Sequence, residues 1–147
     1  MEIPRAGRVL AVDWGEVRIG LALSDESQII ASPLDTLTRR RGKRFPMPRF
    51  LELVGAHAPV GLVVGLPLTP DGGERPATAA ARELATLLGG RTGLPVELVD
   101  ERVTTARAHA AIREQGGSTR GRREDVDALA AAILLQHFLE TRRHAAS

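Results

Sequence analysis

Two apolar segments near the amino terminus are separated only by residues 14–17, and this short connection restricts the fold more than any other feature. The first, Arg8–Asp13, is a short apolar run that ends at Trp14-Gly15, which is typical of a buried strand. The second, Arg18–Asp25, alternates large apolar side chains with small ones, as a strand with two different faces does. Because so short a connection joins only antiparallel neighbours, the pair predicts a β-hairpin.

Further strands and helices follow the hairpin in a regular order. A weaker strand is expected over Gln28–Thr38, at the edge of the sheet, because Pro33 cannot donate a ladder hydrogen bond. The remaining patterns predict strands over Val60–Gly65 and Val96–Val99, and helices over Pro48–Ala58, Ala77–Leu88, Thr104–Gln115 and Glu124–Arg142. The pair Gly89-Gly90 is expected to end the helix that precedes it.

This order of elements predicts an α/β protein. An antiparallel meander of three strands followed by parallel β-α units gives a mixed five-stranded sheet with helices on its faces. The chain has 147 residues, the size of one ordinary domain, and no linker divides it. We therefore expect a single domain over residues 1–147.

The composition excludes several kinds of protein. The chain has no cysteine, and therefore no disulfide, no thiol nucleophile and no thiolate metal site. The amino terminus lacks the apolar stretch and cleavage site of a signal peptide. No segment approaches the roughly 18 apolar residues that span a bilayer. We expect a soluble, cytoplasmic protein that does not bind membranes.

Basic residues are gathered in two segments, although the formal net charge is only +2. One basic run lies within residues 39–44, and the other contains Arg120, Arg122 and Arg123. Either run alone is also typical of a solvated loop. Two runs beside one candidate site favour a polyanionic partner, because guanidinium groups bind phosphate oxygens bidentately. The aromatic content of 3% argues against a protein that binds single strands by stacking on their bases.

Three acidic residues occupy positions where a carboxylate is energetically unfavourable. Asp13 ends the first buried strand, and Glu101 follows the last strand, beside Asp100. Asp127 begins the apolar stripe of the final helix and should therefore face the sheet. Asp13 could instead cap a turn, and Glu101 could form a surface ion pair. An inward carboxylate, however, is costly unless it is paired or bound to a cation.

Acids at two strand ends and on a packing helix can converge on one place. Their mutual repulsion is relieved by a divalent cation, and oxygen ligands without cysteine suit Mg²⁺ or Mn²⁺ rather than Zn²⁺. Two such ions about 3.5–4 Å apart activate water and stabilise the leaving oxygen in phosphodiester cleavage. The acids therefore indicate a reaction class, metal-assisted hydrolysis of a phosphodiester.

Four motifs lie in order along nearly the whole chain, from about residue 7 to about residue 140. They are Asp13-Trp14-Gly15 with Arg18-Ile19-Gly20-Leu21-Ala22 and Ser24-Asp25, Gly65-Leu66-Pro67-Leu68 with Asp71-Gly72, Asp100-Glu101-Arg102 with Thr104-Thr105, and Val126-Asp127-Ala128-Leu129-Ala130-Ala131. Together they resemble the YqgF/RuvX family, described as pre-16S rRNA nucleases and also as Holliday junction resolvases. Each motif alone is weak, but four in register are specific.

The resemblance implies a ribonuclease H-like three-layer fold and a metal-dependent endonuclease that processes the 5′ end of precursor 16S rRNA. The carboxylates that it implies as catalytic and as ligands of Mg²⁺ or Mn²⁺ are Asp13, Glu101 and Asp127. The arginines that it implies near the scissile phosphate or on the nucleic-acid backbone are Arg18, Arg102, Arg120, Arg122 and Arg123. No organic cofactor is implied.

One acid departs from the wider superfamily. Junction resolvases of the RuvC type are similar in outline but carry a Glu at the end of the fourth strand, a place that falls near Gly65 here. The acid occurs one strand later, at Asp100-Glu101. Because adjacent strands are about 4.8 Å apart, a side chain from there must reach across, which favours Glu101 over Asp100 without excluding it.

Other functions remain compatible with the same residues. A Holliday junction resolvase acting on branched DNA would need a two-fold dimer, whereas an RNA-trimming enzyme would not, so the chain is either a monomer or a homodimer. A non-catalytic, RNA-binding ribosome-assembly factor would gain nothing from acids that repel phosphate. An ATP-binding module related to the sugar kinases would close two such domains around its nucleotide, and 147 residues leave no room for the second.

Overall fold

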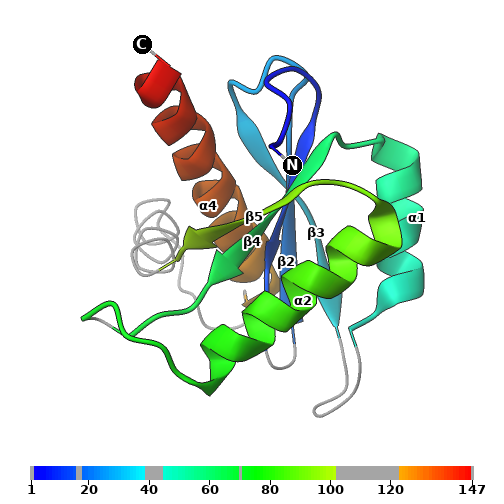
Figure 1. Ribbon diagram of the computed structural model, residues 1–147. Helices are drawn as coiled ribbons and strands as arrows, with labels where there is room; N and C mark the ends of the chain where they lie inside the picture. Colours follow the sequence, from blue (N-terminus) through cyan, green and yellow to red (C-terminus); the bar gives the residue numbers. More distant parts are fainter. Residues whose placement is uncertain (1, 16–17, 39–44, 70, 102–122, 147) are drawn as a thin grey trace.

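The computed structural model describes residues 2–15, 18–38, 45–69, 71–101 and 123–146 (Figure 1). Its strands are β1 (Val9–Asp13), β2 (Arg18–Ser24), β3 (Ala31–Thr38), β4 (Gly61–Leu66) and β5 (Val96–Asp100). Its helices are α1 (Met47–His57), α2 (Pro76–Thr92) and α4 (Arg123–Ala146). The predicted helix over Thr104–Gln115 and the basic run within residues 39–44 lie outside the described residues.

The strands form one sheet in the order β3-β2-β1-β4-β5. The pairs β1–β2 and β2–β3 are antiparallel, whereas β1–β4 and β4–β5 are parallel. This arrangement confirms the predicted hairpin and the mixed five-stranded sheet. It also confirms β3 as an edge strand: Pro33 lies opposite Ala22, beside an irregularity in the register that follows Leu21.

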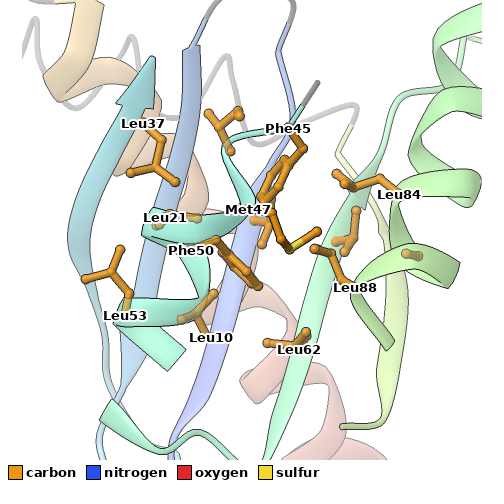
Figure 2. Close-up of a cluster of buried hydrophobic side chains, with 14 residues drawn as sticks. Leu10, Leu21, Leu37, Phe45, Met47, Phe50, Leu53, Leu62, Leu84 and Leu88 are labelled. Carbon is orange, nitrogen blue, oxygen red and sulfur yellow. The ribbon is translucent and has the colours of Figure 1, made fainter. Parts of the chain in front are cut away.

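The sheet separates two hydrophobic cores. Figure 1 shows α1 and α2 on one face and α4 on the other. The first core joins Phe50 of α1 and Leu88 of α2 to alternate residues of the strands, among them Leu10 and Leu62 (Figure 2). The second joins α4 to the intervening strand residues, such as Ala11. Each strand thus contributes one side-chain set to each core, as the period of two requires.

The end of α2 differs from the prediction. The helix passes through Gly89 and Gly90 and ends at Thr92, with Gly93 in the left-handed conformation at φ 74°. Its last turn is held by packing and by a side-chain bond, since Leu88 is fully buried and the Thr92 hydroxyl donates to the Leu88 carbonyl at 2.7 Å. Glycine permits a helix to end but does not compel it to, so tertiary contacts decided the boundary.

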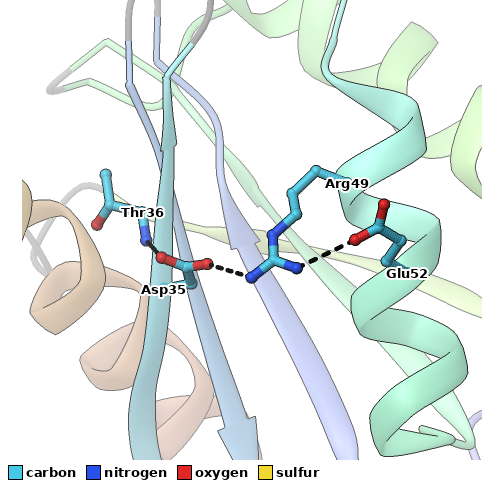
Figure 3. A network of polar contacts seen from close by, with 4 residues as sticks. All are labelled: Asp35, Thr36, Arg49 and Glu52. Atoms are coloured by element: carbon cyan, nitrogen blue, oxygen red, sulfur yellow. Dashed lines mark hydrogen bonds and ion pairs between the residues drawn. The ribbon is translucent and has the colours of Figure 1, made fainter.

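The outer surface of α1 is linked to the edge strand by a small polar network (Figure 3). Arg49 lies 3.5 Å from a carboxylate oxygen of Asp35 on β3 and 3.2 Å from one of Glu52 on α1. All three side chains are exposed, so each ion pair contributes at most about 1 kcal/mol.

Among the described helices, none is long and apolar enough to cross a membrane.

The turn between β2 and β3 is closed by the carboxylate of Asp25. Its Oδ1 accepts hydrogen bonds from the backbone N–H groups of Ile29 at 2.8 Å and Ile30 at 2.9 Å. Because donors on Ile30 and Ile29 favour the charged form, the pKa of Asp25 is lowered from its usual 3.8.

We expect Asp25→Asn to melt at a lower temperature than the wild type near neutral pH, and the difference to shrink in acid. The folded-state pKa lies below the unfolded value of 3.8, so the ionised carboxylate stabilises the fold fully above that pH. Its contribution is lost as the pH falls through the lower folded-state value. Thermal melts from about pH 7 to about pH 2 measure this difference. A constant difference over that range, or the same trend in Glu26→Gln, would contradict the assignment.

Candidate active site

Asp13 lies at the carboxyl end of β1, in the middle of the sheet. Its neighbour across the hairpin is Gly20 of β2, and β4 runs parallel to β1 on the other side. Val12 belongs to the core under α1 and α2, whereas Ala11 belongs to the core under α4. Side chains alternate along a strand, so Asp13 faces α4.

Glu101 reaches Asp13 from the far side of β4. Its backbone N–H donates to the carbonyl of Leu66 at 3.3 Å, which fixes the chain just after β5. The carboxyl groups of Glu101 and Asp13 lie close together, and each acts on the pKa of the other. The Oε2 atom of Glu101 is buried and lies over Gly65, where a side chain would overlap it. The side chain of Glu101 therefore reaches across the neighbouring strand, as predicted.

The environment of this pair disfavours two negative charges. Burial raises the pKa of Asp13 well above its usual value, and the charges of Glu101 and Asp127 raise it further. Burial also raises the pKa of Glu101, against the opposing effects of the neighbouring Asp13 carboxyl group and the positive charge of Arg75. A cation bound between the two carboxyl groups would offset their repulsion and favour their charged forms.

Asp127 lies in the first turns of α4 and faces the sheet, as its place on the apolar stripe predicted. Its Oδ2 accepts a hydrogen bond from Nε of Arg18 at 2.8 Å, and both side chains are only 29% exposed. The helix comes so close to β2 that a Cβ on Gly20 would overlap the carbonyl oxygen of Asp127. Asp127 is thus paired with Arg18, which lies two positions before Gly20 on β2.

The three acids are neighbours without forming a closed ligand set. Among the residues that the structure describes, no three His, Asp or Glu side chains are gathered tightly enough to hold a metal ion. The donor chemistry still fits Mg²⁺ or Mn²⁺, because Asp13 and Glu101 offer carboxylate oxygens in a partly buried, mutually repelling pair. Asp127 would join them by exchanging Arg18 for the ion.

Of the five predicted arginines, the structure describes two. Arg18 lies in the site, at the start of β2, and Arg123 is the first residue of α4. Arg102, Arg120 and Arg122 lie outside the described residues. Sequence reasoning missed Arg75, whose charge acts on Glu101 from the residue before α2. A signal existed: Arg75 occupies a helix N-cap, directly before Pro76, where a hydroxyl or acidic residue is usual.

Residues 7–141 match the family model described as RuvX, Holliday junction resolvase. The chain belongs to the RuvX family. A relative from a Nocardioides species is 44% identical over 143 residues, which cover 95% of this chain and 91% of the relative. One from Anaeromyxobacter dehalogenans is 42% identical over 135 residues, covering 92% and 98%. Both bear the name "Putative pre-16S rRNA nuclease".

Solved structures extend the match to the fold. The RuvC protein of T. thermophilus in complex with a Holliday junction superposes with a TM-score of 0.56 at 20% identity, over 92% of this chain and 96% of that one. The Fowlpox virus resolvase with its junction DNA gives 0.59 at 9% identity, over 92% and 98%. These likenesses confirm the ribonuclease H-like fold predicted for this RuvX-family member. Membership of the family confirms the predicted enzyme class, a nuclease.

We expect Gly20→Ala to lower the free energy of unfolding by about 1–3 kcal/mol, because the added methyl group would meet the backbone of α4 rather than a flexible side chain. The displacement of α4 should also move Asp127 and lower nuclease activity. Urea denaturation measures the first effect. Gly90→Ala is the matched control, since a Cβ there meets nothing within 4 Å, and it should be neutral or stabilising. Equal stability of the two variants would refute the close approach.

We expect Arg18→Gln to lower the free energy of unfolding by about 1–2 kcal/mol, because it leaves the half-buried carboxylate of Asp127 without its cation beside Asp13. Chemical denaturation in metal-free buffer measures the loss. Arg49→Gln breaks two exposed pairs and should change stability by less than about 0.5 kcal/mol. If both arginines prove equally dispensable, the Arg18–Asp127 pair does not stabilise the fold.

Proposed function

We propose that this RuvX-family chain is a metal-dependent endonuclease that cleaves phosphodiester bonds in structured RNA, processing the 5′ end of precursor 16S rRNA. The observation that carries the proposal is the convergence of three acids: Glu101 crosses over Gly65 of β4 toward Asp13, and Asp127 is close enough to raise the pKa of Asp13. A protein that only bound RNA would be weakened by such a cluster, because acids repel phosphate. The names of the curated relatives support the substrate.

Each residue of the site would have its own role in cleavage. Asp13, Glu101 and Asp127 would hold Mg²⁺ or Mn²⁺ through carboxylate oxygens. A divalent cation bound there lowers the pKa of an attacking water and stabilises negative charge on the scissile phosphate. Arg18, once Asp127 leaves it, offers its guanidinium to a phosphate oxygen, as arginine does in phosphate recognition.

The wider binding surface is proposed from the sequence. Arg102, Arg120, Arg122 and Arg123 would contact the backbone of the nucleic acid, in a single domain over residues 1–147 that works in the cytoplasm. Contacts of this kind make affinity fall steeply as salt is added, since bound phosphates release their counterions.

A second substrate is favoured by the description of the family model, which names a Holliday junction resolvase. Cutting a four-way junction symmetrically requires two active sites related by a two-fold axis, and hence a homodimer. Precursor rRNA needs one site only, so a monomer would serve. The molecular mass of the protein in solution, measured with and without each substrate, distinguishes the two functions as directly as cleavage does.

We expect wild-type protein with Mn²⁺ or Mg²⁺ to cut a structured precursor-rRNA fragment, and to cut single-stranded RNA or a four-way DNA junction much less. Asp13→Asn and Glu101→Gln should each lower the rate at least about 100-fold while leaving RNA affinity intact. Glu97→Gln, an exposed acid on β5, is the charge-matched control and should retain full activity.

Each other outcome has a definite meaning. Preferential cutting of the junction, lost in Asp13→Asn, would replace RNA by branched DNA as the substrate. Tight RNA binding with no cleavage in either metal would refute the nuclease and leave an RNA-binding assembly factor. Cleavage that survives in Asp13→Asn would mean that the activity belongs to a contaminant or to other residues.

A further inference from the structure

We propose that Gly65 is a positioning residue of this site: its missing side chain leaves the space through which Glu101 crosses β4 to reach Asp13. The inference rests on the proposed function and adds a residue to it. It is carried by the buried Oε2 atom of Glu101, which lies where a side chain on Gly65 would be.

The topology makes the crossing necessary. Asp13 ends β1 and Glu101 follows β5, with β4 between them in the sheet. Neighbouring strands are about 4.8 Å apart, so a side chain leaving β5 must pass over the β4 backbone before it meets one on β1. Leu66 lies opposite Asp100, which places Gly65 one position earlier on β4, at the crossing point.

Position 65 lies on the same face of the sheet as Asp13. Val64 belongs to the core under α1 and α2, and Val63 to the core under α4. By alternation, a side chain at position 65 would project toward α4, the face that also carries Asp13. A Cβ there would overlap Oε2 of Glu101 and would lie 3.2 Å from a methyl carbon of Leu134 on α4.

Glycine is needed at this position for space and not for backbone conformation. The described glycines with positive φ are Gly7, Gly72 and Gly93, and Gly65 is not among them. Glycine inside a strand normally lowers stability relative to alanine, because it loses more conformational freedom on folding. The packing of Glu101 gives a reason for glycine at a place where the backbone accepts any residue.

The test is Gly65→Ala in the full chain. The overlapping atom is the end of a flexible side chain, so the variant should fold while Glu101 is displaced from Asp13. We expect Mn²⁺ affinity of the protein alone, measured by calorimetry, to fall about 10- to 100-fold, with a similar loss in single-turnover cleavage. RNA affinity without metal should stay within about two-fold, because no phosphate-binding residue changes.

Three further variants make the result specific. In Glu101→Gln, adding Gly65→Ala should cause no further loss of Mn²⁺ affinity or cleavage, because residues that act through one group are not additive. Gly55→Ala, in α1, is the control: a Cβ there meets nothing within 4 Å, so binding and cleavage should stay at wild-type levels. If Gly65→Ala unfolds, Leu134→Val in the same chain removes the second close contact and restores a folded protein to measure.

The outcomes distinguish this inference from the function it rests on. Full Mn²⁺ affinity and cleavage in folded Gly65→Ala, beside an active wild type, would overturn the role of Gly65 and leave the nuclease intact. Additive losses in the double variant with Glu101→Gln would show that Gly65 acts on something other than Glu101. A wild type that neither binds Mn²⁺ nor cleaves would overturn the proposed function and this inference with it.

Discussion

The burial of the first four residues of β1 on both faces is the constraint on which the rest of the structure depends. Val9, Leu10, Ala11 and Val12 are all 0% exposed, and they alternate between the core under α1 and α2 and the core under α4. A strand buried on both sides must lie in the middle of the sheet, with β2 and β4 as its neighbours. Its last residue, Asp13, is thereby held at the centre of the sheet, where β2 begins and β4 ends.

The candidate site is a place where the fold holds charges that repel one another. Three carboxylates approach from β1, the end of β5 and α4, and two arginines offset part of the cost. Arg18 pairs with Asp127 at 2.8 Å, and the charge of Arg75 opposes the effect of burial on Glu101. An arrangement of this kind is costly for stability and is suited to binding cations.

Two glycines make the approach of these acids possible. Gly20 allows the backbone of α4 to lie directly on β2, which brings Asp127 within reach of Arg18. Gly65 leaves room for Glu101 above β4. Neither adopts a positive φ, so in both cases the smallness of the residue matters and its flexibility does not. Local propensity scales treat such glycines as defects in a strand, and only the neighbouring elements show what they permit.

Much of this was contained in the sequence, because it depends on local patterns. The alternation in Arg18–Ser24 and the short link before it determined the hairpin, and the stripe that begins at Asp127 determined which side of α4 meets the sheet. The tertiary structure alone decided where α2 ends, which partner Asp127 takes and that Arg75 acts on Glu101. These facts depend on distances between residues far apart in the chain, and periodicity carries no information about such distances.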